Sequence, residues 1–177
     1  TCNRLPEVEQ VVICSADKDL TQMVKGDSVV CYDRRREKFL DEAGVVEKFG
    51  VSPSSIPDLL ALTGDAADGI PGIPKWGAKT SSQLLFHYGH IEDIPSDPSA
   101  WGVKVRGAAT AAESLNSHTE EARLYKDLTT LRTDVPMDTS LAALEWKGAD
   151  RKKYEALCED LGFGRLASLP HKWSDKP

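Results

Sequence analysis

The sequence predicts an α/β fold in which part of a parallel sheet is followed by a helical lobe. Three observations support this prediction. A short apolar run, Val11 to Cys14, ends in a charged loop, a second β-rich run spans Ser28 to Tyr32, and segments with helical spacing and capping residues follow from about residue 41. Short apolar runs bounded by turn signals are typical of buried parallel strands. We therefore expect two domains, 1–50 and 51–177.

The composition predicts a soluble globular protein. Of its 177 residues 40% are hydrophobic, and no apolar run approaches the roughly 18 residues of a membrane span, so we expect no membrane contact. The net charge of −6 excludes bulk attraction to nucleic acid, so any phosphate must be bound locally. None of the four cysteines forms a CxxC pair, and Cys14 and Cys31 are expected to be buried residues of a reduced intracellular compartment.

The first predicted strand ends in the loop Ser-Ala-Asp-Lys-Asp. Ligand crevices of open α/β sheets lie at the carboxyl ends of strands, so Asp17 and Asp19 are expected to project into one. Two aspartates in such a loop are by themselves a weak sign of a metal site, because Asp is common in loops and caps. Leu20 to Val24 is expected to form a short helix.

Capping residues then predict the helices in order. Asp33 to Lys38 reads as a solvated turn, after which Asp41 is an N-cap candidate for a helix that runs to Phe49 before Gly50. Ser55 and Pro57 mark the start of the next helix, whose leucines are expected to face inward. Further helices are expected over residues 78–88, 103–116, 119–131 and 150–161.

The stretch Thr63 to Leu85 carries the chemistry. Asp65 and Asp68 lie three positions apart, which on a helical turn separates side chains by about 5–6 Å, and their oxygens suit Mg²⁺ or Mn²⁺. Carboxylates clustered without a cation repel one another, and divalent ions would remove that conflict. We therefore predict that one metal site is formed by Asp17, Asp19, Asp65 and Asp68.

A locally basic hairpin follows these aspartates. No acidic residue occurs from Gly69 to Ile91, and the free N–H groups of the next helix favour a phosphate site. Trp76 is open to three interpretations, a core anchor, a base-stacking face or an interface residue, of which we favour packing of the hairpin. The candidate DNA-binding residues are Gly72, Lys75, Trp76, Gly77, Lys79 and Thr80.

Several collinear motifs resemble the 5′ nuclease family, namely the 5′→3′ exonuclease domain of DNA polymerase I and the flap endonucleases. The motifs are SADKDLTQMV, the block from VVEKFGVSPSS to SSQLL, YKDLTTLRTDVPM and CEDLGF, and together they cover Val11 to Leu169. The resemblance implies a PIN-like nuclease core and a helical lobe with a helix-three-turn-helix, or helix-hairpin-helix, at about residues 70–88. It also implies hydrolysis of DNA phosphodiesters near a 5′ end with two divalent ions.

The resemblance also assigns roles to residues. Asp17 and Asp19 match the aspartates of the family's TxDKD loop, and Asp65 and Asp68 match its GDxSDN segment. Ile73 to Thr80 match the helix-hairpin-helix, in which backbone groups bind a monovalent cation, K⁺, and DNA phosphate.

The chain departs from the family at three points. Gly69 stands where the family has Asn, and Lys75-Trp76-Gly77 stands where it has G-I-G, which removes one glycine from the implied K⁺ site. The N-terminal half of the family has no counterpart, so we expect either that this chain is a fragment of a longer product or that the N-terminal half is a separate partner chain. We accordingly expect the isolated chain to bind DNA weakly and not to cleave it.

Two other functions fit parts of the sequence. A haloacid-dehalogenase-like phosphatase would use Asp17 in its DxDxT motif, but too few residues separate this motif from GDAAD to build the intervening sheet. A catalytically inactive, nuclease-derived scaffold that binds DNA or protein would fit Gly69, Lys75 and the missing half.

Overall fold

A computed structural model describes residues 5–136 and 140–174. The chain divides into two compact units, Thr1–Val135 and Pro136–Pro177. The boundary predicted at residue 50 concerns a different division, between a nuclease core and a helical lobe, and stays a prediction.

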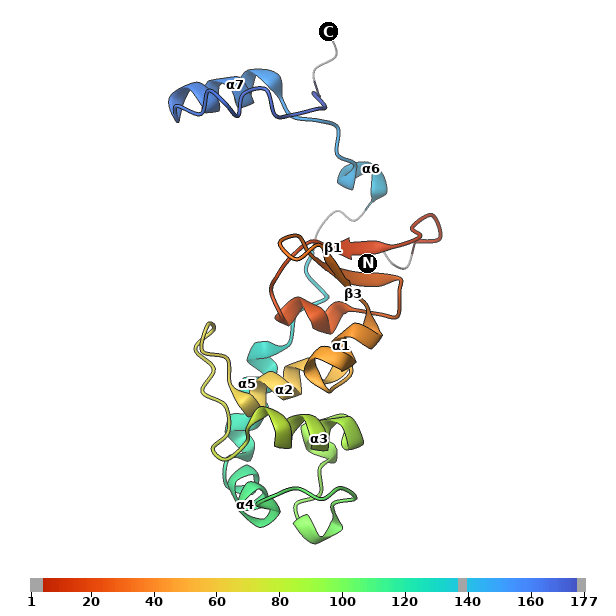
Figure 1. Cartoon of the computed structure of the whole chain (residues 1–177), viewed down its shortest axis with the longest axis vertical. Coiled ribbons are helices and arrows are strands. Elements are labelled where there is room, and N and C mark those ends of the chain that lie inside the picture. The colour runs from red at the N-terminus through yellow and green to blue at the C-terminus, as the bar shows by residue number, and fades with distance from the viewer. Residues whose placement is uncertain (1–4, 137–139, 175–177) are drawn as a thin grey trace. The chain divides into compact units, whose positions relative to one another are not determined.

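The first unit contains a three-stranded sheet in the order β1-β2-β3. Strand β1 (Val11–Ile13) runs parallel to β2 (Val29–Asp33), and β2 pairs in antiparallel fashion with β3 (Lys38–Leu40). The sheet lies at one end of this unit and helix α4 at the other (Figure 1). The unit therefore has the mixed α/β fold that the sequence predicts.

The first strand is less buried than predicted. Val12 is 44% exposed and Cys14 is exposed, whereas Cys31 on β2 is buried. Among the described residues β1 pairs only with β2, so it is an edge strand, and only the central strand β2 shows the burial expected of a parallel strand. The expectation of burial was thus wrong for Cys14 and correct for Cys31.

Short helices follow β1 and β3, and the second of them is capped as predicted. The predicted short helix after the first loop is the 3₁₀ helix η2 (Asp19–Met23). Helix α1 (Glu42–Phe49) begins after Asp41, whose carboxylate accepts a hydrogen bond of 2.8 Å from the backbone N–H of Gly44, and ends before Gly50. A cap of this kind contributes about 1 kcal/mol to stability.

The 3₁₀ helix η3 (Pro53–Ser55) leads into α2 (Ile56–Thr63), in which Pro57 takes the second position. The Ser55 hydroxyl bonds to that of Ser52 at 3.0 Å and does not cap the helix as predicted. The inward-facing leucines of α2 are Leu59, Leu60 and Leu62, all buried.

Helix α3 (Ala78–Tyr88) has the predicted bounds, and α5 (Thr119–Thr129) ends two residues early. Helix α4 (Ala108–Ser117) begins five residues later than predicted, because Gly107 at φ 75° lies outside the right-handed helical region. The short 3₁₀ helices η4 (Ile91–Asp93) and η5 (Pro98–Ala100) lie between α3 and α4.

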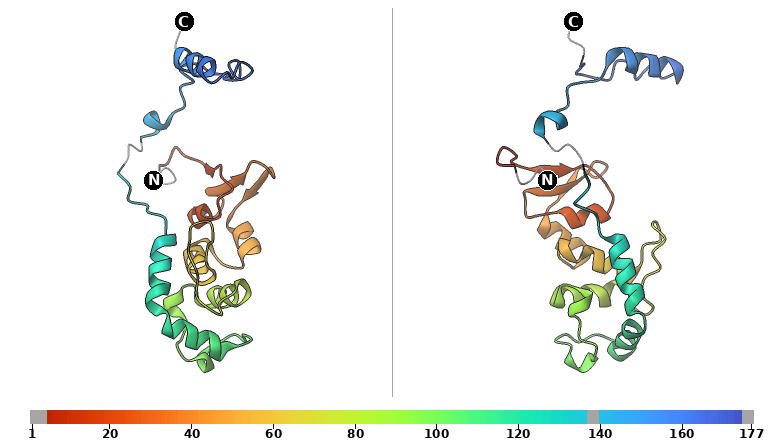
Figure 2. Two further views of the ribbon diagram at one scale, coloured as in Figure 1. Left: turned by 90° about the vertical axis from the view of Figure 1, so that its left-hand side faces the viewer. Right: turned by 180° about the vertical axis from the view of Figure 1, so that it is seen from behind.

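Helix α2 is the centre of this unit. It packs against α3 and α5, an arrangement that the views of Figures 1 and 2 both show. The largest fully buried apolar side chains are Ile56, Leu62, Leu84, Leu85, Val45 and Val51. Burying each contributes about 1.5–3 kcal/mol, so this core fixes the position of the segments attached to α2.

The second unit contains α6 (Leu141–Leu144) and α7 (Arg151–Asp160). Asp150 caps α7 by accepting a hydrogen bond of 2.9 Å from the backbone N–H of Lys153, close to the predicted bounds 150–161. Trp173 packs edge-on against Tyr154. Within residues 5–136 and 140–174, no helix combines the length and the apolarity that crossing a membrane requires.

Candidate functional site

Carboxylates from two distant segments meet in the first unit. Asp19 opens η2, and Asp65 and Asp68 follow α2, yet an oxygen of each lies within 4.8 Å of an oxygen of the other two. Asp65 is buried, Asp19 is mostly buried and Asp68 is exposed. The group, here called the acidic cluster, therefore has a buried base and an open side.

The turn that carries Asp65 and Asp68 is not the helical turn that the sequence suggested. Asp65 and Ile70 form an antiparallel bridge with two backbone hydrogen bonds of 2.8 Å, so the two aspartates lie on a tight turn. Gly69 closes this turn at φ 73°. Asn also tolerates this left-handed conformation, so glycine in place of the family's asparagine is compatible with the same backbone.

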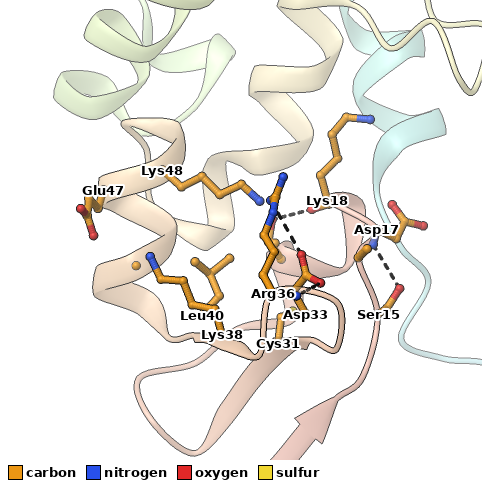
Figure 3. Close-up of a pocket in the computed structure, with 13 residues that line it drawn as sticks. Ser15, Asp17, Lys18, Cys31, Asp33, Arg36, Lys38, Leu40, Glu47 and Lys48 are labelled. Atoms are coloured by element: carbon orange, nitrogen blue, oxygen red, sulfur yellow. Dashed lines mark hydrogen bonds and ion pairs between the residues drawn. The ribbon is translucent and has the colours of Figure 1, made fainter.

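Asp17 lies outside the acidic cluster, although the sequence groups it there. Its Oδ1 accepts a hydrogen bond of 3.1 Å from the backbone N–H of Asp19, and its own N–H donates to Ser15 Oγ. Figure 3 shows Asp17 beside Ser15 in this loop. A short aspartate that bonds two residues ahead shapes its own loop, which is the ordinary behaviour of Asp in turns.

Lys18 is the site residue that the sequence reasoning missed. Its ammonium donates a hydrogen bond to Asp65 Oδ2 and lies 3.7 Å from Asp19 Oδ1. This hydrogen bond lowers the pKa of Asp65. Desolvation by burial lowers the pKa of Lys18, but the hydrogen bond to Asp65 and the nearby aspartates outweigh it, so that this pKa is raised. The available signal was a lysine flanked by two aspartates at the end of a strand.

Asp19 is the least satisfied member of the acidic cluster. Its Oδ1 is buried without a hydrogen-bond partner in the structure, and burial, followed by the adjacent carboxyl of Asp68, raises the pKa of Asp19 to about 6. Both features indicate a carboxylate whose charge Lys18, at 3.7 Å, compensates only in part. A divalent cation with oxygen ligands, such as Mg²⁺ or Mn²⁺, fits this donor set.

Residues 64–77 form the hairpin between α2 and α3. A Cβ at Gly72 would lie 2.5 Å from the backbone nitrogen of Gly64, so only glycine permits this approach. The backbone N–H of Ile73 then donates to the carbonyl of Leu62 at 2.8 Å. Gly72 therefore fixes the hairpin against the end of α2.

Trp76 anchors the hairpin from inside. The side chain is buried, its Nε1–H donates to the carbonyl of Ala111 at 3.0 Å, and its ring meets Trp101 edge-on. The hydroxyl of Ser114 also donates to the carbonyl of Pro74. Packing, the interpretation favoured from the sequence, accounts for Trp76, and its place among the DNA contacts is corrected because no ring face is exposed for a base.

The exposed side of the hairpin is polar and cationic. Lys75 and Lys79 are exposed, and Lys75 adopts a left-handed backbone conformation at φ 70°. Gly77 precedes α3, and no atom lies within 4 Å of where its Cβ would be, so the start of the helix is open. The first N–H groups of a helix have no partner within it, and here Thr80 lies in that turn.

The comparisons with known proteins agree with this arrangement. The family model described as "5′-3′ exonuclease, C-terminal SAM fold" matches residues 51–152. The chain belongs to this 5′-3′ exonuclease family. The resemblance seen in the sequence is confirmed, and the phosphatase alternative is left without support.

Similar sequences include two bacterial DNA polymerases. The chain is 42% identical over 156 residues to DNA polymerase I of Rhizobium leguminosarum, which covers 88% of this chain and 15% of the polymerase. It is 34% identical over 161 residues to DNA polymerase I of Bacillus subtilis (strain 168), covering 89% and 18%. The chain thus spans less than a fifth of the length of these relatives.

Similar folds include structures of the bacteriophage T5 5′-exonuclease. The form with bound zinc matches with a TM-score of 0.57 at 20% identity, covering 68% of this chain and 43% of that chain. A flap endonuclease of the same phage, in a complex with DNA and metal ions, matches with a TM-score of 0.56, 20% identity and the same coverage. These likenesses show a nuclease fold.

Proposed function

We propose that the chain is the DNA-gripping C-terminal part of a 5′→3′ exonuclease or flap endonuclease that hydrolyses DNA phosphodiesters. The observation that carries this proposal is the acidic cluster, two of whose aspartates lie in the same segment as the exposed cationic hairpin. The names of the similar proteins, a DNA polymerase and a 5′-exonuclease with zinc, support it. A metal site beside a phosphate-binding surface is the arrangement that phosphodiester hydrolysis requires.

In this proposal Asp19, Asp65 and Asp68 hold a divalent ion, Mg²⁺ or Mn²⁺. When bound there, the ion would supply Lewis acidity that activates water and stabilises charge on the phosphate. Lys18 holds Asp65 ionised, and Asp17 keeps the loop in place by accepting the N–H of Asp19. In this proposal Lys18 and Asp17 therefore hold the carboxylate oxygens of the site in place, and Lys18 balances part of their negative charge.

The hairpin is proposed to be a helix-hairpin-helix that binds one strand of duplex DNA. Lys75, Lys79 and the free N–H groups around Gly77 and Thr80 would contact phosphates, while Trp76 and Gly72 hold the backbone. The exposed ammonium of Lys75 meets phosphate directly in this proposal. Potassium at the hairpin stays a prediction.

Among the described residues, three carboxylates lie close enough together to bind one ion. We propose that the ligands of a second ion come from the N-terminal part of the nuclease, in the same polypeptide or as a separate chain. The isolated chain then binds duplex DNA weakly and does not cleave it.

The test supplies that N-terminal part and measures cleavage of a 5′-flap DNA with Mg²⁺. We expect Asp65→Asn to lower the rate at least about 100-fold, because it removes a metal ligand and the partner of Lys18. Asp93→Asn, an exposed position at the end of η4, is the matched control and should leave the rate unchanged. Equal rates for the two variants would refute the assignment.

DNA binding is tested separately. We expect Lys79→Ala to weaken duplex affinity and to flatten the dependence of affinity on salt by about one ion, because it removes one phosphate contact. An unchanged salt slope would place the DNA contact elsewhere.

A scaffold that binds DNA without cleaving it is the second candidate. It is favoured by Lys18, which already compensates Asp65 without a metal. Firm DNA binding by the complete protein, with no cleavage in Mg²⁺ or Mn²⁺, would establish it.

A further inference from the structure

The second unit has little hydrophobic core of its own. It spans Pro136–Pro177, far fewer than the roughly 70–80 residues below which a single core rarely suffices. Of the buried apolar side chains that the structure describes, only that of Cys158 belongs to this unit. Within residues 140–174 the structure shows neither a disulfide nor a group of metal-binding side chains. Small units without such supports are commonly stabilised by association with another chain.

Large apolar side chains of this unit are exposed instead. Leu157 in α7 is 53% exposed and Leu161, just after the helix, is 51% exposed. The chain then runs back along α7 (Figure 1), where the O–H of Tyr154 donates to the carbonyl of Leu166 at 3.0 Å. The returning segment adds three more exposed side chains, those of Phe163, Leu166 and Leu169. Apolar side chains exposed together in one small unit mark an interaction site.

One face of α7 combines its exposed leucine with opposite charges at the two ends of the helix. Lys153, Leu157 and Asp160 recur at spacings of four and three residues, which places them on one face. The side chain of Lys153 is 86% exposed, and its only ion-pair partner among the described residues is Asp150 at 3.5 Å. Asp160 is exposed as well. This face is therefore open to a partner from end to end.

The order of charges along α7 is opposite to the order that its own dipole favours. Basic residues occupy positions 151–153 in the first turn, and Glu159 and Asp160 lie at the end of the helix. Carboxylates stabilise the start of a helix and cations stabilise its end, so this order costs stability in an isolated helix. It is complementary to an antiparallel copy of the same helix, because each basic end then lies beside an acidic end.

We propose that two copies of the chain associate through this face of α7, with the two helices antiparallel about a two-fold axis. In a symmetric pair, residue i of one copy meets residue j of the other and j meets i, so the contact of Lys153 with Asp160 occurs twice. The point midway between these positions lies beside Leu157, so the leucines of both copies are buried between the two ion pairs. The proposal needs neither metal nor DNA and is independent of the proposed function.

Sedimentation equilibrium of the whole chain, without DNA, tests the proposal. Two short helices form an interface below the standard size, so we expect a dissociation constant on the order of 10 μM and measure over an about 100-fold range of concentration around it. Leu157→Ser should raise this constant at least about 10-fold, because it removes apolar surface from the centre of the contact. The matched control is Leu124→Ser on α5, whose leucine is likewise 53% exposed and which should leave the constant unchanged.

Charge reversal gives a sharper test. Lys153→Glu alone, or Asp160→Lys alone, places like charges opposite each other twice in every pair, so each variant by itself should be monomeric over the same range. An equimolar mixture of the two variants should associate again, because both contacts then join opposite charges. Each reversal improves the match of α7 to its dipole, so a lost association is not the result of an unfolded helix.

Three outcomes overturn the inference. A chain that stays monomeric over the whole range does not pair through α7. A dimer that neither Leu157→Ser nor the single reversals weaken is formed by another surface. A mixture of the two reversal variants that stays monomeric rules out the antiparallel order of the helices.

Discussion

The carboxylates found near the two ends of α2 differ in how completely they are hydrogen-bonded. In the first turn of α2 Asp58 is fully buried, yet its carboxylate bonds Lys126 Nζ at 2.8 Å, the backbone N–H of Ile91 at 3.0 Å and His90 Nδ1 at 2.9 Å. Beyond the last turn of α2, a carboxylate oxygen of Asp65 lies within 4.8 Å of one of Asp19, whose buried Oδ1 has no hydrogen-bond partner. A satisfied buried carboxylate holds helices together, whereas an unsatisfied one marks a place for a ligand.

The largest expected effect comes from removing the satisfied aspartate. We expect Asp58→Ala to destabilise the chain by about 3–5 kcal/mol, because it removes the buried carboxylate that bonds Lys126, His90 and the backbone N–H of Ile91 and so links α2 to α5. Urea unfolding measures this loss. Asp93→Ala, an exposed aspartate, should change the free energy of unfolding by less than about 0.5 kcal/mol. A loss below about 1 kcal/mol for Asp58→Ala would remove the contrast between the two ends.

At the other end, Asp19→Asn should stabilise the metal-free chain at pH 7 by about 1 kcal/mol, a figure discounted for partial exposure. The folded-state pKa of Asp19, about 6, is above its ordinary value. The folded chain therefore binds more protons between about pH 4 and pH 6, so this group's contribution to stability falls as the pH rises through that window.

Unfolding of the wild type and of Asp19→Asn at pH 4 and at pH 7, without divalent ions, measures the effect. The two proteins should differ little at pH 4 and most at pH 7. A variant that is less stable than the wild type at pH 7 would show that the charge of Asp19 is already compensated.

The hairpin after α2 provides a further contrast, between Lys75 in a strained left-handed backbone and Lys79 in an ordinary helical one. Lys75→Gly should raise the free energy of unfolding by about 1 kcal/mol, because a left-handed backbone is strained for lysine and not for glycine. The same change should weaken duplex binding, since it removes an exposed cation. Lys79→Gln, in ordinary helical backbone, should weaken binding without changing stability. Equal stability of wild type and Lys75→Gly would mean that the hairpin stores no strain.

The smallest effect is expected at the rim of the satisfied network. Glu92 accepts from Lys126 at 2.8 Å but its side chain is largely exposed. We expect Glu92→Gln to cost about 0.5 kcal/mol or less, since exposed ion pairs contribute little. A loss as large as that of Asp58→Ala would mean that the exposed partner, and not the buried one, holds Lys126.

The sequence predicted most helix boundaries because caps act locally. Asp41 and Asp150 each bond a backbone N–H three residues ahead, so their effect depends on neighbours in the chain. The approach of Asp19 to Asp65 and Asp68 was also predicted, from the logic of clustered carboxylates.

Other features depend on contacts that local patterns do not encode. The exposure of Cys14 depends on which strands flank β1, and the tight turn at Asp65 depends on its bridge to Ile70. The conformation of the loop before η2 decides that Asp17 lies outside the acidic cluster and that Lys18 bonds Asp65. A DxD pattern does not reveal which carboxylate faces the partner segment.

The most direct measurement of the central claim is titration of the chain with Mn²⁺ by calorimetry at pH 7. The account predicts one saturable site per chain, lost in Asp19→Asn and in Asp68→Asn and retained in Asp93→Asn. Absence of saturable binding, or equal binding by all these variants, would contradict a metal site formed by the acidic cluster.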